Sequence, residues 1–176
     1  MELKEAIETR RSIRKYKNEE VSNELILEIL KEATHAPSGH NIQPWRFKLL
    51  EKDEKNLIAD KLSNKFINDK LHSAHNTADI IRNCSKLVMV FNEEAENDFA
   101  RDINILSIGG IIDEILLLAT EKGLGTLWIA NTNNIKDEIK DTLNVDLEPI
   151  SCIAFGYKDQ DPNKRPRKDF EDIIIK

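Results

Sequence analysis

A long apolar stretch, from about Ala95 or Asp98 to Lys122, is the feature of this sequence that most limits its fold. Isoleucine, leucine and alanine occur on nearly every side of its helical projection, which predicts a helix buried in mid-fold or at a subunit contact. Gly109 and Gly110 would cost this helix about 1 kcal/mol each relative to alanine, and close approach of another backbone would offset that loss. A tight crossing within the chain and a contact between two copies explain the glycines equally well.

Shorter elements alternate around this stretch. Apolar runs predict strands at Trp45–Leu50, Lys86–Phe91, Leu127–Ala130 and Pro149–Gly156. Helical spacing predicts helices over residues 2–9, from the cap Ser22 to before Pro37, across much of 53–84, and from Ile135 to about Leu143. The sequence shows no repeat or linker, so 1–176 is expected to be a single α+β or α/β domain with helices over a central sheet of four or five strands.

The end of the chain, from Phe170 to Lys176, has its own pattern. Ile173, Ile174 and Ile175 are β-branched and therefore strand-prone. An apolar strand at the end of a chain needs the edge of a sheet as its partner.

Composition excludes several classes of protein. The net charge of −6 and the pI near 5.3 argue against unspecific nucleic-acid binding, which depends on a basic face. No apolar run approaches the roughly 20 residues of a membrane span, and the N-terminus has no signal-peptide core, so we expect a cytoplasmic protein. Cys84 and Cys152 have no CxxC spacing and are expected to be buried thiols. His72 and His75 lack Cys, Asp or Glu partners at a ligand spacing, so no metal is expected.

A cluster of three arginines, Arg10, Arg11 and Arg14, surrounds Ser12 just after the first predicted helix. Guanidinium groups bind phosphate or carboxylate through paired hydrogen bonds. In an acidic chain this cluster favours a local anionic partner, with a solvated basic turn as the alternative. Lys158–Lys168 forms a second cationic segment, in an exposed proline-rich loop.

The stretch Ala36–Trp45 is expected to be a shaped loop, because two prolines and a glycine surround Ser38, Asn41 and Gln43. Its backbone groups need partners, which a ligand or a neighbouring subunit could supply. A plain polar turn is the alternative.

Three of these stretches occur in an informative order: Arg10–Arg14, then Ala36–Phe47, then Leu116–Ala119 leading into Gly123–Ile129. Together with the basic loop around Arg165 and Arg167 they resemble the FMN-dependent nitroreductase family. The resemblance runs from about Arg10 to the C-terminal tail.

The resemblance implies a homodimer of α+β subunits, each with a central mixed or antiparallel sheet, and with FMN at each of two subunit interfaces. The long helix and an exchanged C-terminal strand would interlock the subunits. The tail that ends at Ile175 would then complete the partner's sheet.

Residue roles follow from the same resemblance. Arg10 and Ser12 look like ligands of the FMN phosphate and ribityl chain, with Arg165 and Arg167 on the same phosphate. Arg11, inside the same motif, is expected to be a further cofactor-binding residue. Arg14 falls where the family has a cation near the flavin pyrimidine edge. Further flavin contacts would come from Gly125 and Thr126, against the ring, and from four residues of the other subunit: Pro37, Ser38, Gly39 and Asn41.

The implied activity is that of an oxidoreductase without a catalytic side chain. NADH or NADPH would deliver hydride to flavin N5 and leave, and a small-molecule acceptor such as a nitroaromatic, a quinone or a flavin would follow in a ping-pong sequence. No GxGxxG fingerprint occurs in the chain, as one shared site would allow. A flavin-binding or flavin-sensing protein without turnover is the alternative, and a phosphate-binding or nucleic-acid-binding module is a further one.

The sequence departs from the family pattern in places. Glu114 stands where an amide residue is common, and residues 53–84 give no clear equivalent of two flavin-contacting residues, for which Asn64 and Lys65 are candidates. The chain has little room for a long lid insertion. The acceptor and the choice between NADH and NADPH are therefore left open.

Overall fold

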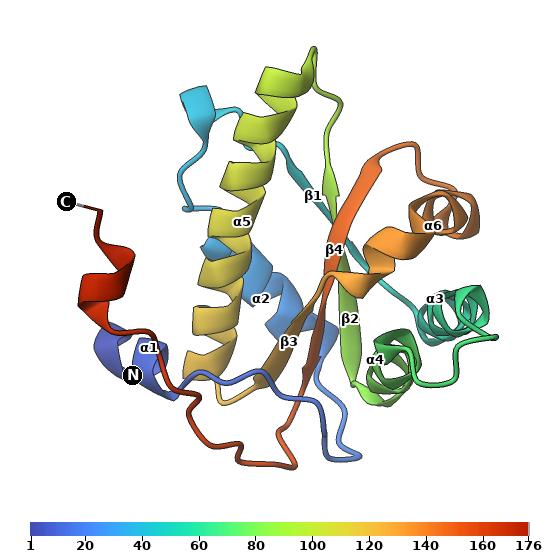
Figure 1. The fold of residues 1–176 in the computed structure, drawn as a ribbon, viewed down its shortest axis with the longest axis horizontal. Helices are drawn as coiled ribbons and strands as arrows, with labels where there is room; N and C mark the ends of the chain where they lie inside the picture. The colour runs from blue at the N-terminus through green and yellow to red at the C-terminus, as the bar shows by residue number, and fades with distance from the viewer. Residues whose placement is uncertain (176) are drawn as a thin grey trace.

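A four-stranded antiparallel sheet forms the centre of the protein, whose computed structural model describes residues 1–175 (Figure 1). The strand order is β1-β2-β4-β3, with bounds β1 Trp45–Leu49, β2 Lys86–Asn92, β3 Gly125–Ile129 and β4 Glu148–Gly156. The α+β fold and the four predicted strands are thus confirmed, and the sheet is antiparallel throughout.

The two faces of the sheet carry two separate apolar cores because side chains alternate along each strand. Val88 and Val90 of β2 pack into the first core, beneath α2 (Asn23–Ala33) and α5 (Asp98–Glu121). Leu87 and Met89 pack into the second, beneath α3 (Lys52–Lys65), α4 (Ser73–Asn83) and α6 (Lys136–Leu143). The central strands β2 and β4 are therefore buried on both faces, which explains their continuous apolar runs.

The long helix α5 begins at a capping residue, Asn97, whose side chain accepts from the Ala100 N–H at 2.9 Å. It packs on the sheet, on α2 and on α1 (Leu3–Thr9). Within the described chain it leaves an apolar face open, with Phe99 76% and Leu106 73% exposed, and the predicted subunit contact of this face stays a prediction.

The two glycines of α5 do not mark a crossing within the chain. A Cβ added at Gly109 or Gly110 would meet nothing within 4 Å, so no other element of the described chain approaches them. Of the two explanations, the contact between two copies is the one still open, and it stays a prediction.

By length and composition alone, α5 is long and apolar enough to cross a membrane. A soluble protein's core helix passes the same test, and α5 buries eight of its residues within the fold.

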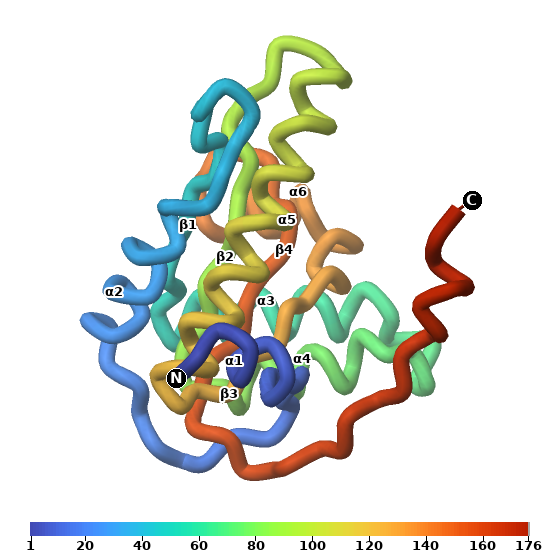
Figure 2. The backbone as a smooth tube through the Cα atoms, turned by 90° about the vertical axis from the view of Figure 1, so that its left-hand side faces the viewer, coloured from blue at the N-terminus to red at the C-terminus, as the bar shows by residue number. Residues whose placement is uncertain are grey.

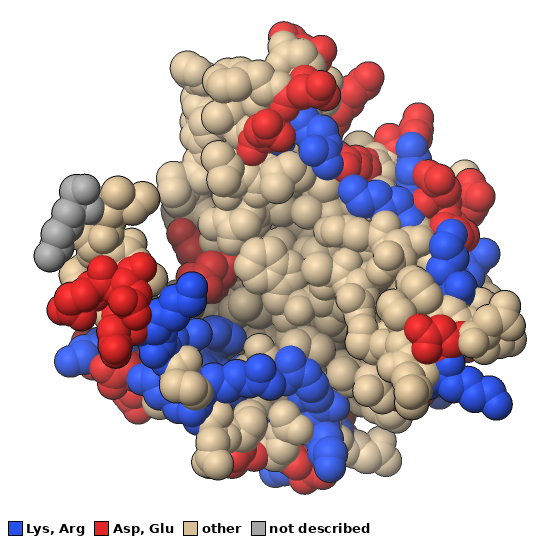
Figure 3. Space-filling model, viewed as in Figure 1, with Lys and Arg blue, Asp and Glu red and all other residues tan. Residues whose placement is uncertain are grey.

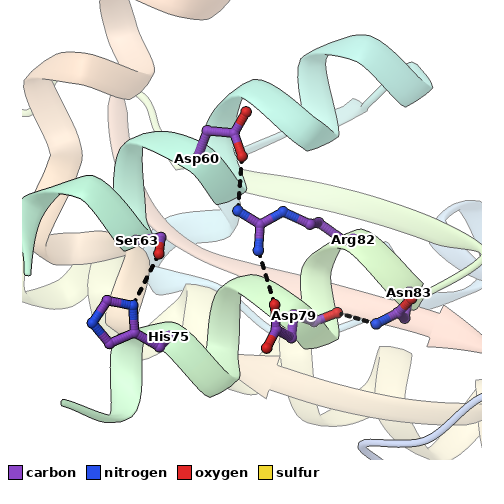
Figure 4. A network of polar contacts seen from close by, with 6 residues as sticks. All are labelled: Asp60, Ser63, His75, Asp79, Arg82 and Asn83. Atoms are coloured by element: carbon purple, nitrogen blue, oxygen red, sulfur yellow. Dashed lines mark hydrogen bonds and ion pairs between the residues drawn. The ribbon is translucent and has the colours of Figure 1, made fainter. Parts of the chain in front are cut away.

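The break between α3 and α4 falls at Phe66, and His72 caps α4 by accepting from the Ala74 N–H at 3.2 Å. The rings of His72 and Phe66 stack with centroids 3.6 Å apart. His75 Nδ1 lies 2.9 Å from Ser63 Oγ (Figure 4). Both histidines are half-buried and shape the turn between the helices.

An ion-paired arginine joins the same two helices. Arg82 contacts Asp60 of α3 at 2.7 Å and Asp79 of its own helix at 2.9 Å (Figure 4). The pair of helices is therefore fixed as one layer over the second core.

The tail does not form the predicted strand within the single described chain, and its exchange into a partner's sheet stays a prediction. Phe170–Ile173 forms a short 3-10 helix (η3) instead of a strand, and the segment projects away from the body of the molecule (Figure 2). A strand needs a neighbouring edge, and this part of the tail has none within the described chain.

The prediction for the two cysteines is confirmed: Cys84 and Cys152 are free and buried, and burial raises the pKa of Cys84 to about 11.

Candidate functional site

The first arginine cluster lies against the start of β3. After α1 ends at Thr9, the chain runs beside the strand, and the Ile13 N–H donates to the Thr126 carbonyl at 2.8 Å. Ser12 forms an isolated parallel bridge with the same residue. A Cβ at Gly125 would come within 2.9 Å of the Ile13 side chain, so glycine is needed for this approach. Two motifs more than 100 residues apart in the sequence are thus neighbours.

The C-terminal loop continues the same surface. The Lys17 N–H donates to the Tyr157 carbonyl at 2.8 Å, and the Asp159 N–H donates to the Lys15 carbonyl at 3.0 Å. The blue and red segments run together below the sheet in Figure 1, and Figure 3 shows a band of Lys and Arg side chains there. Arg165 and Arg167 are exposed on this loop.

Tyr16 fixes the two segments to each other. Its ring packs so closely on Gly156 that an added Cβ would lie 2.7 Å from it, and its hydroxyl donates to the Ile13 carbonyl at 2.8 Å. Burial raises the pKa of this hydroxyl well above its ordinary range, so it remains a donor.

The arginines differ in what their guanidinium groups bind. Arg11 donates to the carbonyls of Glu8 at 2.7 Å and of Arg10 at 2.8 Å, and Arg14 donates to the Ser12 carbonyl at 3.2 Å. Within residues 1–175, Arg10, Arg165 and Arg167 enter no ion pair. Arg10 and the loop arginines therefore have their donors free for an anion.

Beside Arg14 lies a hollow of about 350 Å³ between α4 and the edge strand β3. Its lining consists of Arg14, Ser73, Asn76, Thr77, Ile80, Leu127, Trp128, Ile129, Ala130 and Asn131. The Asn131 side chain donates to Thr77 Oγ1 at 2.9 Å and to Ser73 Oγ at 3.3 Å, which holds this wall in place.

The strand edge offers backbone hydrogen bonds to the hollow. The Thr126 carbonyl points away from β4 towards Ile13, and alternate residues of a strand direct their amides to the same side. The amide of Trp128 therefore faces the open edge of β3. The hollow combines a cation, a backbone amide, polar side chains from α4 and apolar side chains from β3, which together can orient a small polar ligand.

The predicted candidates of the region 53–84 do not reach this hollow. Lys65 pairs with Glu138 of α6 at 3.3 Å, and Asn64 lies beside it at the end of α3. The residues that do line it, Ser73 and Asn76, were missed. A signal was present, because residues 73, 76, 77 and 80 share one side of a helix and three of them are polar.

Glu114 is also remote from Arg14. It is half-buried and lines a different hollow, of about 380 Å³, with Glu32 and Glu121. Nothing in the structure connects it with the candidate site.

The loop before β1 is a strained turn held by α5. Its backbone has positive φ at three residues that are not glycine: His40 at 49°, Asn41 at 58° and Gln43 at 52°. Such strain persists only where the surroundings fix it, and it is often found at functional sites. Here the Gly39 N–H donates to Ser107 Oγ at 3.4 Å, and a Cβ at Gly39 would lie 2.5 Å from Ile103.

This loop is far from the arginines within one chain. It contacts α5 at Ile103 and Ser107, whereas the Arg10–Arg14 segment lies beyond the other end of the helix, at Gly125 (Figure 1). Nearly four helical turns, about 21 Å, separate Ser107 from the last residue of α5. Gly125 and Thr126 lie with the arginines but are buried, whereas Pro37 and Asn41 are exposed at the distant end.

Comparison with known proteins identifies the family. The sequence model described as "Nitroreductase family" matches residues 7–157. The chain belongs to the nitroreductase family. A Bacillus subtilis protein whose name assigns it to the NAD(P)H nitroreductases, YfhC, is 33% identical over 180 residues, covering 97% of this chain and 91% of that protein.

Two solved structures of the family superpose over nearly the whole chain. A nitroreductase from Desulfovibrio desulfuricans in complex with FMN is 26% identical, with a TM-score of 0.83 over 100% of this chain and 97% of that one. A BluB-like flavoprotein from Clostridium difficile 630 is 27% identical, with a TM-score of 0.82 over 99% and 98%. The fold that the sequence resemblance implies is thus confirmed over nearly the whole chain.

Proposed function

We propose that this member of the nitroreductase family is an FMN-dependent oxidoreductase. It takes reducing equivalents from NADH or NADPH and passes them to a small-molecule acceptor such as a nitroaromatic, a quinone or a flavin. The observation that carries the proposal is that the Arg10–Arg14 segment lies beside the hollow at β3 and is followed by residues that pair with the start of the C-terminal loop, which carries Arg165 and Arg167. The relatives' names and the FMN complex support the choice of cofactor.

The chain's own residues divide the work of binding. Arg10, Arg165 and Arg167 would hold the FMN phosphate through charge-assisted hydrogen bonds, and Ser12 would contact the ribityl chain. Bound FMN would supply the redox chemistry by accepting hydride from the nicotinamide and passing the electrons on. Arg14 would stabilise negative charge on a ring bound in this hollow, because its guanidinium is in place before any charge develops.

The amide of Trp128 would orient the ring at the strand edge. Gly125 and Thr126 act mainly by fixing Ile13, and with it the arginine segment, on β3. We propose a ping-pong sequence because one hollow of about 350 Å³ serves both donor and acceptor, which must then occupy it in turn.

We propose that the site is completed by a second copy of the chain. Pro37, Ser38, Gly39 and Asn41 are at the distant end of α5 and reach a flavin at Arg14 only from another subunit. The open apolar face of α5, around Leu106 and the unpacked glycines, suits such a contact. The projecting tail, with Phe170 66% and Ile173 57% exposed, suits an exchanged segment.

The decisive experiment is the visible spectrum of the purified protein, followed by anaerobic mixing with NADH or NADPH. A flavin spectrum that bleaches on mixing and returns when acceptor is added supports the proposal. A bound flavin that neither nucleotide bleaches would support the non-catalytic alternative. A colourless protein that takes up no added FMN would overturn the proposal.

A further inference from the structure

Residues 10–18 and 157–169, which pair through residues 15–17 and 157–159, concentrate positive charge on one surface, here called the basic ledge (Figure 3). Residues 10–18 contain five Lys and Arg and no carboxylate, and residues 157–169 contain five Lys and Arg and three Asp. The whole chain has 26 Lys and Arg against 32 Asp and Glu, so its other residues are strongly acidic. The basic ledge is therefore a local feature that opposes the net charge.

This charge exceeds what the FMN phosphate requires. A phosphate monoester carries about two negative charges at neutral pH, which Arg10, Arg165 and Arg167 would already neutralise. The lysines of the ledge remain available. A second polyanion that visits the same site would use them.

Lys15 and Lys17 are held in a defined position beyond Arg14. Their backbone pairs with Tyr157 and Asp159, and the bridge between Tyr16 and Lys158 shows that the segment is extended. Tyr16 points inward onto Gly156, and Lys15 and Lys17 lie on either side of it in the sequence. Both lysines are exposed.

The ledge ends at a second hollow, of about 420 Å³, that Lys17 shares with Lys52 and Lys55. Lys55 is only 7% exposed and donates to the Cys84 carbonyl. Within residues 1–175, none of these lysines has a carboxylate within 4.0 Å, whereas Lys48 and Lys86 do.

Acidic side chains at this hollow are mostly occupied. Glu20 pairs with Lys86 at 3.0 Å, and the Glu51 side chain caps the start of α3. Glu19 is the remaining carboxylate of the lining. The track from Arg14 through Lys15 and Lys17 to Lys52 and Lys55 is therefore positive along its length.

We infer that this track binds the adenosine 2′-phosphate of the electron donor, so that NADPH is used in preference to NADH. The inference rests on the proposed function. A 2′-phosphate is recognised by a cationic side chain, whereas sites for NADH use a carboxylate on the free 2′-hydroxyl. Lys17 lies about 10 Å along an extended chain from Arg14, so a dinucleotide with its nicotinamide over the hollow at β3 can reach it.

A binding experiment tests the track without turnover. Calorimetric titration of the purified protein with 2′,5′-ADP and with ADP should show at least about tenfold tighter binding of 2′,5′-ADP, a difference that shrinks as salt screens the lysines. Equal affinities would overturn the inference. Displacement of 2′,5′-ADP by equimolar inorganic phosphate would also overturn it, by showing a general anion site.

Lys17→Gln and Lys52→Gln should each weaken 2′,5′-ADP binding about fivefold and raise the KM for NADPH by a similar factor. The KM for NADH should stay within about twofold of the wild-type value. Lys140→Gln, which removes a lysine paired with Asp146 at 2.8 Å outside the track, is the matched control and should change neither. Equal losses for both nucleotides in the track variants would contradict a role at the 2′-phosphate.

The two proposals fail in different ways. A protein that oxidises NADH and NADPH equally well contradicts this inference and leaves the oxidoreductase in place. A protein that binds no FMN and oxidises neither nucleotide removes the proposed function, while the titration with 2′,5′-ADP still decides whether the track selects that phosphate.

Discussion

At the scale of single residues, neighbouring arginines of one motif have different surroundings. Arg11 binds backbone carbonyls of the segment that ends α1, so it stabilises the turn that presents its neighbours. Arg10 is left without a protein partner of opposite charge among the described residues. An arginine that is already satisfied contributes less to a ligand than one whose donors are free.

Arg10→Ala and Arg167→Ala should each weaken FMN binding by about 1 to 3 kcal/mol, the scale of a lost charge-assisted hydrogen bond. Arg11→Ala should weaken it less, because that guanidinium is engaged by Glu8 and Arg10. Fluorescence titration of the apoprotein with FMN measures all three. Unchanged affinity in both Arg10→Ala and Arg167→Ala would remove these residues from the phosphate site.

Another residue whose surroundings set its chemistry is Glu148, at the start of β4. It binds Arg101 of α5 at 2.6 Å and Lys136 of α6 at 2.9 Å. The hydrogen bonds from Arg101 and Lys136, opposed by partial burial, lower its pKa from 4.5 to about 2.

This pKa predicts a pH dependence of stability. Because the folded pKa lies below the unfolded one, the stabilisation is complete above about pH 4.5 and is lost as the pH falls towards 2. We expect the free energy of unfolding of Glu148→Gln to lie about 1 to 2 kcal/mol below wild type at pH 7. This difference in the free energy of unfolding, measured by urea denaturation, should disappear as the pH falls from 4.5 to 2. A difference that persists unchanged at pH 2 would contradict the lowered pKa of Glu148.

At the scale of elements, α5 joins the two halves of the candidate site and also keeps them apart. Its first turns hold the Gly39 loop, and the chain that follows its last turn carries Gly125 against Ile13. A rigid helix cannot bring its own ends together. The open apolar face between those ends is therefore the place where a second copy would complete the site.

Leu106→Arg tests this role of α5. Leu106 is 73% exposed, so the change should leave the folded chain intact while placing a charge at the expected subunit contact. We expect monomers by light scattering and a loss of FMN at least as large as that of Arg10→Ala. Leu57→Arg, at a residue of α3 that is 50% exposed, is the control and should stay dimeric. A Leu106→Arg protein that is dimeric and yellow would contradict the proposed interface.

At the scale of the whole molecule, the charge is polarised. The chain has a net charge of −6, but the two segments of the basic ledge together contain ten Lys and Arg and only three Asp. Oppositely charged ligands are drawn to such a surface before they bind. The cofactor phosphate and the donor phosphates would therefore approach the same side of the molecule.

Mixed dimers test whether each site is shared between subunits. Arg10→Glu and Asn41→Ala proteins should each bind FMN weakly at both sites, because one side of every site is damaged. A heterodimer of the two variants should regain a single intact site, since both changes then fall on the other one. Its FMN titration should be biphasic, with one site per dimer at wild-type affinity. A single weak phase would show that Arg10 and Asn41 do not meet across subunits.

The sequence by itself determined the elements and much of the chemistry of this protein. Apolar periodicity located the four strands and α5, and clustered guanidinium groups favoured a local anionic partner, because these properties are local to a few residues. The family followed from the order of the motifs. Local patterns did not show that the tail would lack a strand or that His72 would cap α4, since both depend on which neighbours are present.

Only the tertiary structure decided which motifs meet. In the folded chain Ile13 contacts Thr126. Ser73 and Asn76 line the hollow, whereas Asn64 and Lys65 do not. The Gly39 loop lies against the first half of α5, far from the arginines. The tertiary structure also distinguished Arg11 from Arg10, because of the two only the Arg11 guanidinium binds backbone carbonyls among the described residues. The physical reason is that these contacts join residues far apart in the chain, and their geometry is fixed by the packing of helices on the sheet and not by any local preference.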